Sequence, residues 1–197
     1  MKSDPVTQQA KSLIRLNRLE DAFLLLNKAR ISQPRSEHWQ AWSRTLCWVC
    51  NSMGGTFLSK GQEKLGLVLL KWAESLADRG SGMKATVLDN LACYYRRVGK
   101  PRLALMYLEK MNRIASESLP VTSLATTHLN YCLILSELGQ HTEALMHAME
   151  AVVMLQNDFI RNRLLGLCYS EDKIEVLAFA YHNYAAELEF RQRVRGR

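Results

Sequence analysis

The sequence predicts an all-α fold in which antiparallel helix pairs stack on one another as an α-solenoid. Three observations lead to this prediction. Apolar residues recur at steps of three and four along most of the 197 residues, which is the period of an amphipathic helix. Small residues recur at matched intervals, and helices approach each other closely only where side chains are small. Gly or Asn stands at a constant distance before each of these small residues, where a first helix must end.

The small residues define four helix pairs. We place one small residue in the second helix of each pair, at Ala22, Gly66, Ala104 and Ala144, with spacings of 44, 38 and 40 residues. Twelve residues earlier, in the first helices, stand Ala10, Gly54, Ala92 and Cys132. Seven residues later stand Ala29, Ala73, Met111 and Ala151. Five residues before each reference position stand Asn17, Gly61, Gly99 and Gly139, the residue types that favour a left-handed helix cap.

The first two pairs are expected over about residues 6–32 and 36–79. The first begins after Asp4-Pro5, a helix start signal, and ends before Gln33-Pro34. Ser36 is a suitable N-cap for the second pair. Apolar residues at helical spacing predict one long helix over about 37–59, followed by a return helix over 62–78.

The third and fourth pairs are expected over about residues 82–115 and 121–157, joined by a link at 117–120. Apolar residues in 158–169 fit either an extension of the return helix or an insertion. A final helix is expected over about 171–192, because acidic residues at its start complement the helix dipole. We predict that residues 1–197 form a single domain.

The third pair carries a family resemblance. Its first helix has Leu88, Leu91, Ala92 and Tyr95 at repeat spacing, and its second has Ala104, Leu108 and Met111. This order resembles a tetratricopeptide (TPR) repeat. The long period is similar to that of kinesin-light-chain-type repeats, whose first helices carry Asn-Leu-Ala. The matching triplets here are Asn90-Leu91-Ala92 and, more loosely, Asn130-Tyr131-Cys132 and Asn183-Tyr184-Ala185. The resemblance implies a right-handed superhelix whose first helices line a concave groove.

The resemblance also implies a binding site in that groove. Asn90, Asn130 and Asn183 share one repeat position, which faces the groove in the family. An amide offers both a hydrogen-bond donor and an acceptor, so a row of amides is suited to the backbone of an extended peptide. The alternative is that each amide satisfies a polar group of a neighbouring helix. Further residues expected to contribute to the peptide site are Arg97, Asn51, Cys93, Leu133 and His182.

Charge and composition favour a protein partner. The formal net charge of +7 favours acidic partners. Arg97 is suited to pair with a ligand carboxylate through its guanidinium fork, whereas Arg96 is expected to be a solvated helix end. The sequence contains no run of about 18 apolar residues, so no membrane span is expected, and its first residues lack the apolar core of a signal peptide. The odd count of five cysteines favours reduced thiols. We therefore expect a cytoplasmic protein, with the cytoskeletal association that the kinesin-light-chain resemblance implies.

Catalytic and metal-binding motifs are missing from the sequence. It has no phosphate-binding Gly-rich loop, no His-Glu-x-x-His and no nucleophile elbow, so we expect neither enzyme activity nor a cofactor. Cys47 and Cys50 have the spacing of a redox or half-zinc motif. There is no second cysteine pair, and the two residues fall inside a predicted helix, so we interpret them as packing thiols.

The sequence thus predicts a non-catalytic interaction module, or adaptor, that binds a short, extended, acidic peptide segment of a protein partner. The first alternative is a structural scaffold, or a homo-oligomer, within a larger assembly such as a cytoskeletal or motor complex. The least favoured alternative is a nucleic-acid binder that uses the positive charge, including the basic segment 193–197.

Overall fold

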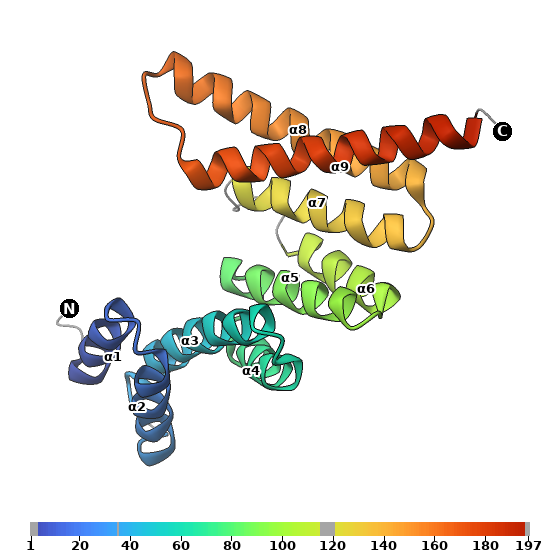
Figure 1. Cartoon of the computed structure of the whole chain (residues 1–197). Coiled ribbons are helices and arrows are strands. Elements are labelled where there is room, and N and C mark those ends of the chain that lie inside the picture. Colours follow the sequence, from blue (N-terminus) through green and yellow to red (C-terminus); the bar gives the residue numbers. More distant parts are fainter. Residues whose placement is uncertain (1–3, 35, 115–120, 196–197) are drawn as a thin grey trace. The chain divides into compact units, whose positions relative to one another are not determined.

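In the computed structural model, residues 4–34, 36–114 and 121–195 are described, and these segments are built from nine α-helices joined by short turns (Figure 1). The helices are α1 Pro5–Arg15, α2 Leu19–Ser32, α3 Trp39–Ser59, α4 Glu63–Leu76, α5 Gly82–Arg97, α6 Pro101–Asn112, α7 Val121–Glu137, α8 His141–Leu164 and α9 Glu171–Arg195. The described residues contain no β-strand, which confirms the all-α prediction.

The chain divides into two compact units, Met1–Tyr94 and Tyr95–Arg197, and the division falls within α5. In the first unit α1 packs on α2, α2 on α3, and α3 on α4. In the second unit α6 packs on α7, α7 on α8, and α9 on both α7 and α8. That the whole chain forms a single domain stays a prediction.

The start of the first unit is fixed by Asp4. Its side chain caps α1 by accepting a hydrogen bond from the backbone N–H of Val6 at 2.9 Å. The indole N–H of the buried Trp42, on α3, donates to the same carboxylate at 3.1 Å. Burial raises the pKa of Asp4, but hydrogen bonds from Thr7, Trp42 and Val6 outweigh it, and the pKa is lowered overall. Asp4 therefore both caps the N-terminus of α1 and connects this end of the helix to α3.

The close approach of α3 and α4 depends on Gly54 and Gly66. A Cβ atom added at Gly66 would lie 2.7 Å from Leu58 Cδ2 and 3.1 Å from the carbonyl oxygen of Gly54. One added at Gly54 would lie 2.9 Å from the side chain of Leu70. Real Cβ contacts are longer, so the backbones of α3 and α4 meet here only because both residues are glycine. This confirms the predicted role of the small residues in the second pair.

The left-handed caps are also confirmed. At all four predicted positions the backbone has a positive φ angle, namely 57° at Asn17, 74° at Gly61, 71° at Gly99 and 76° at Gly139. Each residue ends a first helix and lets the chain reverse into the second helix of the pair.

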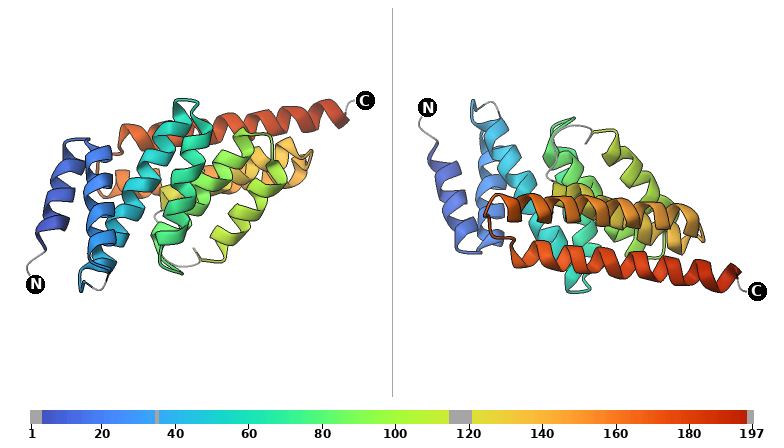
Figure 2. Two further views of the ribbon diagram at one scale, coloured as in Figure 1. Left: turned by 90° about the horizontal axis from the view of Figure 1, so that it is seen from below. Right: turned by 90° about the horizontal axis from the view of Figure 1, so that it is seen from above.

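The second unit has its apolar core where α7, α8 and α9 meet. Leu129 of α7, Leu155 of α8 and Ala180 of α9 are fully or almost fully buried in one cluster. Figure 2 shows α8 and α9 running antiparallel over most of their lengths. Burial of this cluster supplies the hydrophobic free energy that holds the three helices together.

Several predicted boundaries shift. The return helix α8 does not end near residue 157 but continues to Leu164, so 158–164 extend the helix and the turn to α9 follows. The final helix is longer than expected and reaches Arg195. Ser36 is not the N-cap of α3, because the helix begins at Trp39 and the Ser36 hydroxyl accepts from the His38 N–H in the preceding turn. The predicted link at 117–120 and the last two residues of the basic segment 193–197 lie outside the described residues.

Candidate functional site

Two predicted peptide-site amides meet in the first unit. Asn51 lies on α3 and Asn90 on α5, and the Asn90 amide nitrogen donates to the Asn51 oxygen at 2.9 Å. Asn51 is only 8% exposed, and Asn90 is half-buried. The bond links two neighbouring first helices. Part of the hydrogen-bonding capacity of these amides is therefore used between helices, as the alternative interpretation of the Asn residues predicted.

The bonded pair still has the chemistry of a peptide group. The bond uses one of the two amide hydrogens of Asn90 and one acceptor site on the Asn51 oxygen. The Asn51 nitrogen is a further donor and the Asn90 oxygen a further acceptor. A donor and an acceptor are also the two groups that a peptide bond can pair with, namely through its C=O and its N–H. Cys93, one turn further along α5, is half-buried beside them in sequence register.

The second unit holds the remaining predicted site residues. Asn130 and Leu133 lie on α7, buried and half-buried respectively. Asn183 on α9 is buried, and its amide nitrogen donates to the carbonyl oxygen of Phe179 at 2.7 Å within the same helix. Its neighbour His182 is exposed. The structure therefore places Asn130 and Asn183 on two helices that pack on each other, with the Asn183 amide partly used by its own helix.

The structure separates the two arginines at the end of α5. Arg96 donates to the carboxylate of Glu137 on α7, with 3.0 Å between Nη1 and Oε1. Arg97 is exposed. An arginine already engaged by a carboxylate is a weaker receptor for a second one, so Arg97 is the better candidate for a ligand contact.

The structure reveals one cluster that the sequence analysis missed. His128 of α7 and His147 of α8 approach to 3.0 Å between their Nδ1 atoms, and the His147 ring stacks on Tyr131 with a centroid distance of 4.6 Å. They line a pocket of about 250 Å³, together with Met111, Asn112, Leu124, Thr127 and Tyr131. A signal was present: the antiparallel pairing that sets Cys132 opposite Ala144 also sets residue 128 opposite residue 148, next to His147.

The two histidines share one hydrogen bond, so one ring donates while the other accepts. Burial lowers the pKa of His128, and the nearby Glu150 opposes this shift only partly. Burial also lowers the pKa of His147, helped by His128 and opposed by Glu150. The lowered pKa values favour the neutral form of both rings, in which one Nδ1 donates and the other accepts.

We expect acid to destabilise the second unit through this pair. The folded-state pKa values lie below the unfolded value of about 6.5, so the unfolded chain takes up protons first. The stabilisation is complete above that value and decreases as pH falls through it. Urea midpoints measured between pH 7.5 and 5.5 should fall in the wild type and fall less in a His128→Phe/His147→Phe variant. His182→Gln, at an exposed position, should retain the wild-type slope.

The cysteine pair of α3 is buried and chemically quiet. Cys47 and Cys50 are free thiols with almost no exposed surface. Burial raises the pKa of Cys47 to about 11 and that of Cys50 to about 12. Cys47 Sγ also contacts the carbonyl oxygen of Ala73 at 3.3 Å as a hydrogen-bond donor. Thiols in this state pack and do not react, which agrees with the sequence interpretation.

Metal and membrane signals are missing from the described segments. Within residues 4–34, 36–114 and 121–195, no group of three or more His, Cys, Asp or Glu side chains is arranged to hold a metal ion. No helix in that same part of the chain combines the length and apolar character needed to traverse a bilayer.

Comparisons with known proteins identify the fold. Neither a protein-family model nor a curated protein sequence matches the chain. Solved structures do. BtubC (BKLC) from P. vanneervenii is similar with a TM-score of 0.58 and 14% identity, covering 97% of this chain and 78% of BtubC. The nearly identical TPR-like repeats of a kinesin light chain candidate from Podospora anserina give a TM-score of 0.55 at 17% identity, covering 97% of this chain and 92% of that one.

A third similar structure is YrrB, described as a TPR protein with an unusual peptide-binding site. Its TM-score is 0.50 at 16% identity, covering 95% of this chain and 91% of YrrB. At these identities the likeness concerns the backbone and not the site residues. Helix pairs joined by left-handed caps, small residues at their crossings and these structural matches together show that the chain has the tetratricopeptide-repeat fold.

Proposed function

We propose that this protein is a non-catalytic adaptor that binds a short, extended, acidic segment of a protein partner along its first helices. What supports the proposal most directly is the amide pair of Asn51 and Asn90, which is complementary to one peptide group of an extended chain. The fold supports a protein-interaction role, since TPR-type helix pairs are repeat scaffolds with exposed concave surfaces.

The remaining contacts are assigned by position. Asn130 and Asn183 contribute a second set of amides, and Cys93 and Leu133 contribute partly buried apolar contacts. The exposed Arg97 provides a charged contact for an acidic side chain, and His182 is an exposed polar neighbour. The formal charge of +7 favours acidic segments over basic ones. A single site of this kind gives micromolar binding, about −8 kcal/mol. The proposed setting is the cytoplasm.

The test is binding of fluorescent peptides to the full chain. A library of extended peptides rich in Asp and Glu is compared with the same library carrying Asn and Gln. We expect micromolar binding of acidic members only. Asn90→Ala should weaken it about tenfold, the loss of roughly one hydrogen bond to a buried site. Asn157→Ala, at an exposed position outside the row, is the matched control and should bind like the wild type.

Charge selection is tested separately. Arg97→Gln should reduce the preference for acidic peptides several-fold, and added salt should reduce it in the wild type. Arg163→Gln, which removes an exposed arginine on α8, should leave the preference unchanged. Equal binding by wild type and Asn90→Ala, with both variants folded by circular dichroism, would remove the amide row from the proposal. Tight, salt-sensitive binding to single-stranded RNA in place of peptides would support the nucleic-acid alternative.

A further inference from the structure

The last two helices, α8 and α9, expose apolar side chains along one side. Both helices contribute to this side, Met149, Val153 and Ile160 from α8 and Ile174, Tyr181 and Ala185 from α9, which we call the α8–α9 face. All six are exposed, and Ile174, Tyr181 and Met149 are 49%, 44% and 47% exposed. The residues follow steps of four and seven along each helix, so each set occupies one side of its helix.

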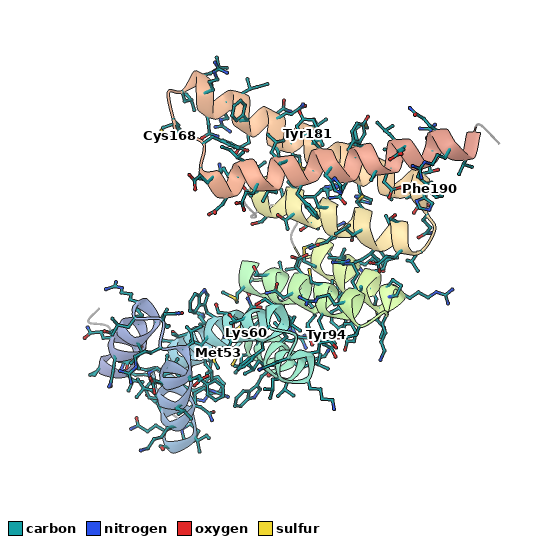
Figure 3. All side chains as sticks on the ribbon, viewed as in Figure 1. Met53, Lys60, Tyr94, Cys168, Tyr181 and Phe190 are labelled. Carbon is teal, nitrogen blue, oxygen red and sulfur yellow. The ribbon has the colours of Figure 1, made fainter. Side chains whose placement is uncertain are left out.

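The two sets lie next to each other because α8 and α9 are antiparallel (Figure 2). Lys173 of α9 reaches Asp158 of α8 at 2.8 Å, and the amide of Gln156 donates to the hydroxyl of Tyr181. These two bonds fix the register of α9 against α8, which places Ile160 level with Ile174 and Val153 level with Tyr181. Figure 3 shows Tyr181 near the middle of α9. The result is one continuous apolar surface and not scattered single residues.

In the other first helices, the repeat positions equivalent to this surface of α9 are buried. Counted from the Asn-Leu-Ala-like triplets, the residues equivalent to Ala185 are Gly54, Ala92 and Cys132, all buried. The residues seven before these positions, equivalent to the exposed Ala178 of α9, are Cys47, Ala85 and Ala125, also buried. In α3, Gly54 is covered by α4, the second helix of its pair. The same register positions on α9 are small and apolar but exposed, which is the form of a helix-packing surface without its helix.

The sequence of α9 is complementary to itself when two copies run antiparallel. With the two-fold axis passing near Asn183, Tyr181 of one copy lies opposite Ala185 of the other, and Leu188 opposite Ala178. A large side chain therefore meets a small one at each level, as ridges meet grooves in helix packing. A two-fold contact of this type places the same patch on both partners.

Charges along α9 favour the same orientation. The N-terminal end carries the exposed acids Glu171, Asp172 and Glu175, while the C-terminal end carries the exposed Arg191 and Arg193. Glu175 and Arg193 are separated by five full turns, so they lie on one side of the helix. Within one copy Arg193 binds Glu189, four residues earlier, through side chains that are 75% and 63% exposed, so this is a solvent-exposed pair whose arginine can also reach a second carboxylate. An antiparallel second copy brings Glu175 near Arg193 of its partner, whereas a parallel copy would oppose like charges.

We propose that the α8–α9 face binds a second copy of this chain, with the two α9 helices packed antiparallel about Asn183. The exposed methionine and tyrosine on this face are residue types enriched at protein interfaces. The inference stands apart from the proposed peptide site, since it uses the exposed side of α9 and not its buried Asn183 amide.

The experiment is sedimentation equilibrium of the full chain from about 1 to 100 μM, a range that spans weak dimers. The wild type should shift from monomer to dimer. Ala185→Arg should weaken association at least tenfold, because the charge would lie against Tyr181 of the partner. Ala41→Arg is the matched control, because Ala41 is also an exposed helical alanine but lies on α3 in the first unit, outside the α8–α9 face, and it should dimerise like the wild type.

The orientation is tested by charge reversal. Glu175→Arg alone and Arg193→Glu alone should each weaken the dimer several-fold, and the double variant should restore it, since the pair is remade across the two-fold axis. A constant monomer mass, or equal dimerisation of Ala185→Arg and Ala41→Arg, overturns the proposal. Failure of the double variant to recover overturns the antiparallel arrangement. Monomers that bind only an added amphipathic helix would assign the face to another partner.

Discussion

Gly66→Val is expected to destabilise the first unit by about 3 kcal/mol, through overpacking of a helix crossing. The Cβ atom alone would lie 2.7 Å from Cδ2 and 2.8 Å from Cγ of Leu58, and 3.1 Å from the backbone oxygen of Gly54. The branched Val side chain adds two more methyl groups. The Leu58 side chain has to move, and α3 and α4 have to separate, which reduces apolar contact along the whole pair.

The matched control for this substitution is Gly55→Val. Gly55 lies in the same pair of helices, but a Cβ atom there meets nothing within 4 Å. Val has a better helix propensity than Gly by a few tenths of a kcal/mol, so the control should be neutral or slightly stabilised. Both variants are compared by urea unfolding at pH 7.5. If Gly66→Val unfolds at the wild-type urea concentration, the close approach of α3 and α4 is wrong.

Leu155→Ala is expected to destabilise the second unit by about 3 kcal/mol, within the range found for buried leucines. Leu155 has no exposed surface and lies in the cluster shared by α7, α8 and α9. Its truncation weakens the apolar packing of α8 against α7 and α9 and leaves a cavity, because neighbouring backbones can close only part of the space.

The control for the second variant is Leu164→Ala, the same change in the same helix at a residue that is 82% exposed. It should change the unfolding free energy by less than about 0.5 kcal/mol, as surface substitutions usually do. Thermal unfolding followed by circular dichroism gives both values. Similar losses in the two variants would contradict the burial pattern along α8.

How far the contacts of the candidate site residues could be predicted from the sequence differs from residue to residue. The register of the Asn-Leu-Ala triplets suggested which amides belong together, but not which atoms they contact. Asn51, one residue away from that register, is the amide that bonds to Asn90. Similarly, Arg96 was expected to be a solvated helix end, but it is half-buried and binds Glu137, 41 residues away in the chain. Which amides a peptide contacts stays a prediction.

The C-terminal end of α8 is determined by tertiary packing and not by the local sequence. The apolar pattern of 158–169 fits a helix or an insertion, because short apolar runs have no unique period. The helix continues since α9 packs along it, with Lys173 bound to Asp158 and Tyr169 packed edge-on against Phe159 at 5.1 Å. These partners come after the segment in the chain, so local sequence could not reveal them.

By itself the sequence determined the helix pairs, their small crossing residues and their left-handed caps. These features depend on steric rules that act within a few residues, such as the positive φ angle that Gly99 and Gly139 tolerate. Only the tertiary structure decided which polar groups pair, that His128 meets His147, and that the α8–α9 face stays exposed. Those outcomes depend on which surfaces meet after the helices pack, and side chains far apart in the chain settle that jointly.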